Sequence, residues 1–121
     1  YGIEVESFMC LPEQLDLSRC NLYGIDLTKV NAVNWKFNDS KLSMAKLQDM
    51  DLTGSNFENA ILESASMILS NISNINLIGA DIKGIFFDSN QVVELEKNYD
   101  LKGSKIYIID KKKIVMYEEY N

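Results

Sequence analysis

The stretch from Leu15 to Ser89 is periodic, and its period is five residues. In steps of five from Leu17, fifteen consecutive positions are apolar: Leu17, Leu22, Leu27, Ala32, Phe37, Leu42, Leu47, Leu52, Phe57, Leu62, Met67, Ile72, Leu77, Ile82 and Phe87. Because 46% of the chain is apolar, such a run arises by chance about once in a hundred thousand trials, which identifies an internal repeat. A second column, two positions earlier, runs from Leu15 to Ile85 and contains only small or apolar residues. Both columns exclude charge, so we expect both to face a core.

A period of five excludes the two regular structures. Five residues advance about 500° around an α-helix, so the apolar column would wander over all of its sides. In a flat strand an odd spacing sends successive members of the column to opposite faces. The pattern instead predicts a chain that turns a corner every five residues and coils around a core. Each side then has two inward and three outward residues, and stacked coils pair through their backbones.

Individual units carry a recognisable pattern. Leu15-Asp16-Leu17-Ser18-Arg19, Met50-Asp51-Leu52-Thr53-Gly54 and Ala80-Asp81-Ile82-Lys83-Gly84 resemble the A(D/N)LXX unit of the pentapeptide-repeat family. The resemblance covers fifteen consecutive units and implies an all-β fold, a right-handed quadrilateral β-helix of about four coils. In that family four units make one square turn. The family's Asp or Asn is replaced by Lys at 36, 41 and 46 and by apolar residues at 61 and 86.

Two further features bear on the coils. The glycines at 24, 54, 79 and 84 all follow the central residue by two positions, where glycine relieves backbone strain at a corner. Trp35 occupies an inward position that otherwise holds smaller residues, so we expect its ring to be buried. Such a ring would bulge its coil or displace a neighbour, and its indole N–H needs an acceptor.

The flanking segments are expected to close the two ends of a single domain, 1–121. Residues 1–14 alternate in polarity up to Pro12, which predicts a strand whose Ile3 and Val5 cover the first coil. Residues 15–89 form the repeat. Within 90–121 we expect a short helix capped by Asn90, then two closing repeat units that bury Leu101 and Ile106. A hairpin with strands Lys105–Asp110 and Ile114–Glu118 follows, and its apolar face is expected to shield Phe86.

Composition excludes several functions. The chain of 121 residues has no histidine, so it cannot build Ser–His or Cys–His nucleophile pairs or histidine-ligated zinc. A net charge of −6 argues against direct binding of nucleic acid or an anionic membrane. No run of about 18 apolar residues is present to span a membrane. We therefore expect no catalytic residues, no cofactor and no metal.

Two cysteines are too few for a disulfide framework. Cys20 lies in an inward column, where a free thiol behaves as a small hydrophobe, and pairing with Cys10 is the alternative. A reduced thiol predicts a cytoplasmic protein. The chain begins at Tyr1 without a methionine, so we expect a processed chain or a piece of a larger protein.

Two sets of outward residues are candidates for a binding site. Five apolar residues occupy columns that the family fills with polar groups: Ile61, Ile68, Leu69, Ile78 and Phe86. A contiguous apolar patch marks an interface, unless the insertion or the hairpin covers it. The second set, Lys36, Lys41 and Lys46, falls on three successive sides of one coil, either as a belt for an acidic partner or simply as solvated surface.

The interpretation that follows is a non-catalytic module for protein–protein contact, whose partner is a different protein or a second copy of the chain. The resemblance offers an alternative, because some members of the family mimic DNA and protect type II topoisomerases. The acidic residues that would serve are Asp16, Asp26, Asp39, Asp49, Asp51, Asp81 and Asp88. Mimicry needs a dense acidic face, whereas the repeat contains nine acidic and six basic residues.

Overall fold

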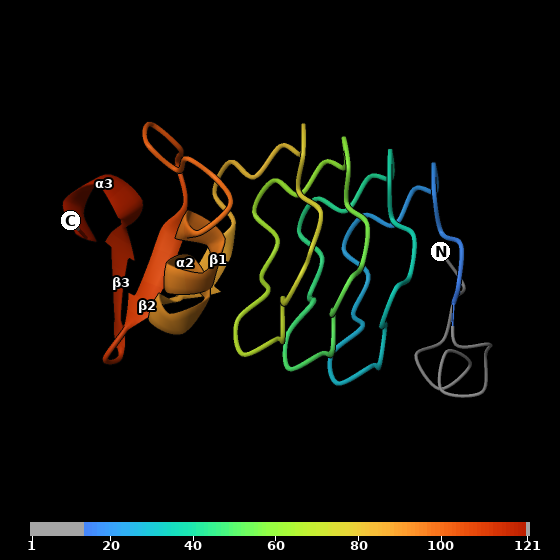
Figure 1. Cartoon of the computed structure of the whole chain (residues 1–121), viewed down its shortest axis with the longest axis horizontal. Helices are drawn as coiled ribbons and strands as arrows, with labels where there is room; N and C mark the ends of the chain where they lie inside the picture. The colour runs from blue at the N-terminus through green and yellow to red at the C-terminus, as the bar shows by residue number, and fades with distance from the viewer. Residues whose placement is uncertain (1–13, 121) are drawn as a thin grey trace.

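The computed structural model describes residues 14–120, and in it the repeat is a β-helix solenoid. Coils of chain stack side by side along the long axis (Figure 1). Isolated parallel bridges join the residue before each central residue to the one twenty positions later. One coil therefore consists of four five-residue sides. We number the sides by these columns: side 1 contains Asp16, Lys36, Asn56 and Asn76; side 2 contains Asn21, Lys41, Ile61 and Asp81; side 3 contains Asp26, Lys46, Ser66 and Phe86; side 4 contains Asn31, Asp51 and Asn71.

The backbone of each coil is bonded to the next coil in a fixed pattern. The amide of a central residue donates to a carbonyl nineteen positions later, as Leu22 N does to Lys41 O at 2.8 Å. The carbonyl two positions before the central residue accepts from the amide twenty-one positions after itself, as Cys20 O does from Lys41 N at 2.9 Å. These bonds satisfy polar groups that a stacked loop would otherwise leave unpaired.

The corners are tight turns with a left-handed residue. At the first complete corner Ile25 N donates to Leu22 O at 3.1 Å, and Gly24 has φ +68°, which is the geometry of a type II turn. The other predicted corner glycines also have positive φ, so their assignment is confirmed. Ten corners hold other residues with φ between 57° and 69°, among them Arg19 and Leu69. The stacking therefore imposes this conformation even where the residue disfavours it.

The core is the pair of columns expected from the sequence. The central residues are buried throughout, except that Ile82 is half-buried near the end of the stack. Trp35 is 2% exposed, which confirms that it points inward. Its ring lies 6.2 Å from that of Phe37, and Phe37 stacks on Phe57 at 4.7 Å between centroids.

One corner is open. At Leu47–Met50 the hydroxyl of Ser70, in the next coil, accepts from Met50 N at 2.9 Å and donates to Leu47 O at 2.6 Å. The other buried serines of this column, Ser40 and Ser55, donate to the carbonyl of their own turn instead. The Ser70 hydroxyl thus bridges two coils and replaces the direct bond from Met50 N to Leu47 O.

The last coil ends in strand β1, Phe86–Asp88, which leads directly into helix α2, Ser89–Glu96. The helix is present where it was expected, but Asn90 is not its cap. Asp88 is the N-cap, because its carboxylate accepts from Gln91 N at 2.9 Å. The helix buries Gln91, Val92 and Leu95 against the solenoid.

The residues that follow α2 continue the stack. The Tyr99 hydroxyl accepts from Leu77 N at 2.9 Å and donates to Ile75 O at 3.0 Å, which are groups of side 1. Leu101 and Ile106 are buried as expected, and Gly103 has φ +80°.

Strands β2, Tyr107–Asp110, and β3, Lys113–Met116, complete a three-stranded sheet in the order β1-β2-β3. β2 is parallel to β1 with Phe86 opposite Tyr107, and β3 is antiparallel to β2. The hairpin was expected, but its second strand ends earlier, because the short helix α3, Tyr117–Tyr120, begins there.

The predicted strand over 1–14, with Ile3 and Val5, lies outside the described residues, apart from Gln14. Cys10 also lies outside them, and Cys20 is half-buried. No helix in the described part is long and apolar enough to cross a membrane.

Candidate protein-binding surface

The structure divides the five apolar candidates among three sides. Ile68, Leu69 and Phe86 share side 3, whereas Ile61 lies on side 2 and Ile78 on side 1. Leu69 is 69% exposed at a corner, and Phe86 is half-buried. The three residues of side 3 therefore face the same side of the solenoid, and the other two face different sides.

The hairpin extends side 3. Tyr107 of β2 stacks on Phe86 with centroids 5.1 Å apart. Residues of β2 and β3 that alternate with the buried Ile108 point outward with Phe86. We call the resulting surface the apolar strip: Ile68, Leu69, Phe86, Tyr107, Ile109, Ile114 and Met116.

The last four residues of the strip were missed as candidates. Their signal was present in the sequence, because outward residues alternate with inward ones along a strand. β2 pairs beside β1 instead of folding over it, so the hairpin does not cover Leu69, and Ile114 is 61% exposed. Two exposed residues that were also missed, Tyr23 and Met44, lie on side 2, as does Ile61.

The three lysines do not converge. Lys36, Lys41 and Lys46 are exposed on sides 1, 2 and 3 respectively. Lys36 lies directly beside Asp16 in the stack, and Lys46 beside Asp26. Each lysine therefore faces a different direction in solvent, and two of them lie next to an acidic residue of the preceding coil.

Local hydrogen bonds hold these two carboxylates ionised. The Thr28 hydroxyl and amide donate to Asp26 at 2.5 and 3.0 Å, and they lower the pKa of Asp26 below its ordinary value, with a further contribution from Lys46. Asp16 has the same arrangement: bonds from Ser18 lower its pKa first, and Lys36 adds to the effect. In both cases the carboxylate orders its own turn.

The seven acidic residues considered for DNA mimicry are spread around the solenoid. Asp16 lies on side 1, Asp81 on side 2, Asp26 on side 3 and Asp51 on side 4. Asp39 and Asp49 occupy corners, and Asp88 caps α2. The described residues therefore have no single face on which these carboxylates gather.

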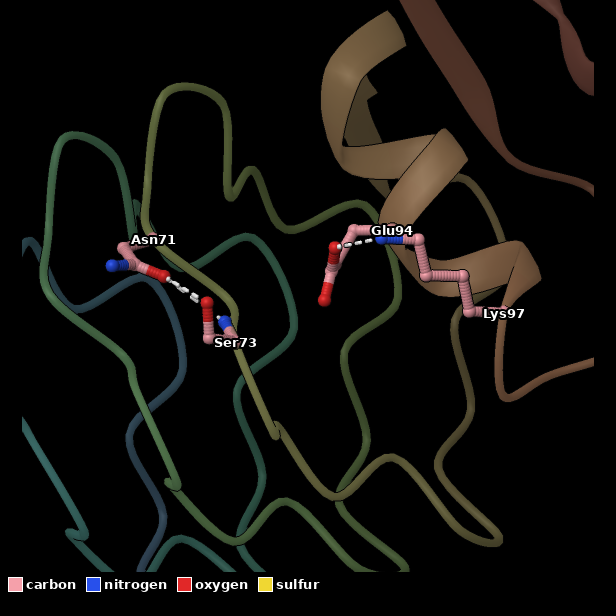
Figure 2. Close-up of polar contacts among 4 residues, drawn as sticks. All are labelled: Asn71, Ser73, Glu94 and Lys97. Atoms are coloured by element: carbon pink, nitrogen blue, oxygen red, sulfur yellow. Dashed lines mark hydrogen bonds and ion pairs between the residues drawn. The ribbon is translucent and has the colours of Figure 1, made fainter.

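A shallow groove of about 350 Å³ separates side 4 of the last coil from α2. Figure 2 shows three residues that line it, Asn71, Ser73 and Glu94, together with Lys97. On the coil, Asn71 Oδ1 accepts from the Ser73 hydroxyl at 2.8 Å, and on the helix Lys97 Nζ lies 3.2 Å from Glu94 Oε2. These polar groups are already partnered, and among residues 14–120 no cluster of three metal-ligating side chains was found.

Comparison with known proteins agrees with this geometry. The family model for pentapeptide repeats matches residues 40–84 as eight copies. No curated protein sequence matches the chain.

Solved structures of pentapeptide repeat proteins are similar to the fold. One from Nostoc PCC 7120 aligns with a TM-score of 0.52 at 19% identity, covering 86% of this chain and 91% of that protein. HetL, described as involved in heterocyst differentiation regulation in the same strain, aligns at 26% identity over 58% of this chain and 39% of its own, with a TM-score of 0.36. A protein of the Arabidopsis thaliana thylakoid lumen aligns at 22% identity over 83% of this chain and 84% of its own, with a TM-score of 0.30.

Proposed function

We propose that this chain, a pentapeptide-repeat protein, is a non-catalytic module that binds another protein through the apolar strip on side 3. The observation that carries the proposal is the 69% exposure of Leu69 on the same side of the solenoid as the stacked pair Phe86–Tyr107. The proposed location of this module is the cytoplasm.

The chemistry of the strip supports contact with a protein. Exposed apolar patches on water-soluble domains mark interaction sites, and aromatic residues are enriched in the centre of interfaces. The Phe86–Tyr107 stack is a rigid apolar surface, because β1 and β2 hold both rings from a hydrogen-bonded sheet. A rigid aromatic pair loses little side-chain entropy on binding, which favours it as an anchor.

The same features support a non-catalytic function. The interior of the coils is filled by the two buried columns, so the solenoid offers no internal pocket for a substrate. The groove beside α2 is shallow, and the Asn71 and Ser73 side chains that line it bond to each other. We do not put forward the topoisomerase alternative, because the carboxylates it needs are distributed over four sides.

Site-specific photo-crosslinking tests the proposal. A photoreactive residue is placed at position 69, with position 78 as the matched control, because Ile78 is similarly exposed, 60%, but lies on side 1. We expect position 69 to crosslink to a defined protein in the source cell and position 78 not to do so. Crosslinks of equal yield at both positions would contradict the proposal.

A binding measurement with the crosslinked protein completes the test. Leu69→Glu places a charge in the strip and is expected to weaken binding by about tenfold or more. Ile78→Glu should leave binding unchanged. Neither residue is buried, so both variants should fold, and equal thermal midpoints would verify this.

A further inference from the structure

Within residues 14–120, no strand pairs with the outer edge of β3. In the sheet order β1-β2-β3, β3 is bonded on one side only, and Figure 1 shows it as the outermost strand, with α3 at one end. We propose that two copies of the chain associate by antiparallel pairing of their β3 strands. This proposal goes beyond the partner of side 3, since it concerns a backbone edge and a second copy of the same chain.

The hydrogen-bonding register leaves suitable groups at this edge. Tyr117 N donates to Ile106 O at 3.0 Å, so Tyr117, Val115 and Lys113 direct their backbone groups toward β2. Alternate residues of an antiparallel strand face opposite edges. The amides and carbonyls of Ile114 and Met116 therefore face outward, away from β2.

A twofold axis through Val115 uses all four of these groups. In that register Ile114 of one copy lies opposite Met116 of the second copy, and Met116 of the first copy lies opposite Ile114 of the second. Each of these two pairs exchanges two backbone hydrogen bonds, which is the narrow pairing of an antiparallel ladder. The result is a continuous six-stranded sheet across the two copies.

Charge selects this antiparallel arrangement. Three lysines, Lys111, Lys112 and Lys113, precede the apolar part of β3, and Glu118 and Glu119 follow it. All five are exposed, and the only ion pair within residues 14–120 joins Lys97 to Glu94. Antiparallel pairing brings the lysines of one copy to the glutamates of the other at both ends of the interface, whereas parallel pairing would oppose like charges.

The turn itself retains its lysines at a conformational cost. Lys111 and Lys112 have φ of 50° and 66°, a geometry in which a hairpin turn favours Asn and Gly. The exposed strand that follows has neither a proline nor a bulge to prevent pairing with another chain. A favourable interaction of the two lysines with a second copy accounts for their presence.

The proposed dimer also enlarges the apolar strip. A twofold axis perpendicular to the sheet keeps the outward faces of both copies on the same side. Phe86, Tyr107 and Met116 of the two copies then form one surface, with Ile114 near its centre.

Charge exchange tests the proposal. One variant combines Lys111→Glu with Lys112→Glu, and the other combines Glu118→Lys with Glu119→Lys; the mass of each in solution is measured by sedimentation equilibrium over a range of concentrations. We expect the parent to dimerise, each variant alone to associate about tenfold or more weakly, and an equimolar mixture to recover association. Higher salt should weaken the parent dimer.

Two outcomes would overturn the proposal: a parent that stays monomeric at millimolar concentration, or a mixture that associates no better than the separate variants. Ile114→Pro adds a backbone control, because it removes an outward amide and is compatible with an edge strand, and it should also abolish the dimer. Leu69→Glu should leave self-association unchanged. The crosslinking test at position 69 is thus independent, and either proposal can fail alone.

Discussion

Asp88 and Gln91 exchange two hydrogen bonds of 2.9 Å, each side chain accepting from the backbone amide of the other residue. This capping box begins helix α2. The remaining polar atoms of both side chains reach back to the last coil. Asp88 Oδ2 accepts from Leu69 N at 3.0 Å, and Gln91 Nε2 donates to the carbonyls of Met67 and Ser70 at 2.6 and 2.8 Å.

These contacts give partners to several backbone groups of the last coil where the chain leaves the repeat. Elsewhere a corner amide such as Asp49 N donates to the backbone carbonyl nineteen positions later. At Leu69 the carboxylate of Asp88 takes the place of that carbonyl, and at Leu77 the hydroxyl of Tyr99 does so. Side chains therefore substitute for the next coil where the backbone turns away.

Gln91→Ala is expected to destabilise the fold by about 1–3 kcal/mol, because it removes the donor to the Ser70 carbonyl from a buried position. The Met67 carbonyl loses one of two donors, since it still accepts from Ser70 N. Urea unfolding followed by circular dichroism measures the change. Asn90→Ala is the matched control, since Asn90 is exposed and adjacent, and it should change stability by less than about 0.5 kcal/mol. Equal effects of the two substitutions would show that Gln91 does not join α2 to the coil.

Gly54→Ala is expected to cost more than Gly24→Ala. Both glycines have left-handed φ, 69° and 68°, so each substitution carries a cost of about 1–2 kcal/mol. Of these two glycines, only Gly54 has a neighbour that an added Cβ would clash with, the side-chain oxygen of Asn34. The thermal midpoints of both variants test this. Asn34→Ala combined with Gly54→Ala should remove the excess, and a persistent difference would assign it to the backbone.

Asp26→Asn is expected to lower the thermal midpoint by up to a few degrees at neutral pH. The folded pKa of Asp26 lies below its ordinary value of 3.8. The contribution of the carboxylate to stability is therefore complete above that pH and is lost as the pH falls through the folded pKa. The thermal midpoints of parent and variant, measured from pH 7 down to pH 2, should begin to converge below about pH 4 and meet once the pH is below the folded pKa. A constant difference across this range would mean that the charge contributes nothing.

Removal of residues 90–121 is expected to produce aggregation or self-association through the exposed last coil. The deletion removes the buried partners of the core end, Leu95, Leu101, Ile106 and Ile108, and leaves β1 without β2. Light scattering and thermal unfolding would measure the result. A truncated chain that is monomeric and as stable as the parent would refute the idea that this segment closes the stack.

The periodic part of the structure could be predicted from residue order alone. The exclusion of charge from the columns of Leu17 and Leu15 determined which side chains are buried, and the glycines marked corners. The physical reason is that each unit buries its own two residues in the same way, so the information is local and repeated. The buried position of Trp35 followed from the same rule.

The tertiary structure decided what lies next to what at the C-terminal end. The Asp88-x-x-Gln91 spacing that caps α2 is a local pattern, but the bond from Leu69 N to Asp88, which crosses a coil, is found only in the tertiary structure. The five apolar candidates were visible in the sequence, but only the stacking of twenty-residue coils separates Ile61 and Ile78 from Phe86 and adds Tyr107 to it. Local periodicity specifies which way a side chain points; its neighbours on the surface depend on the coil length and on the pairing of distant strands.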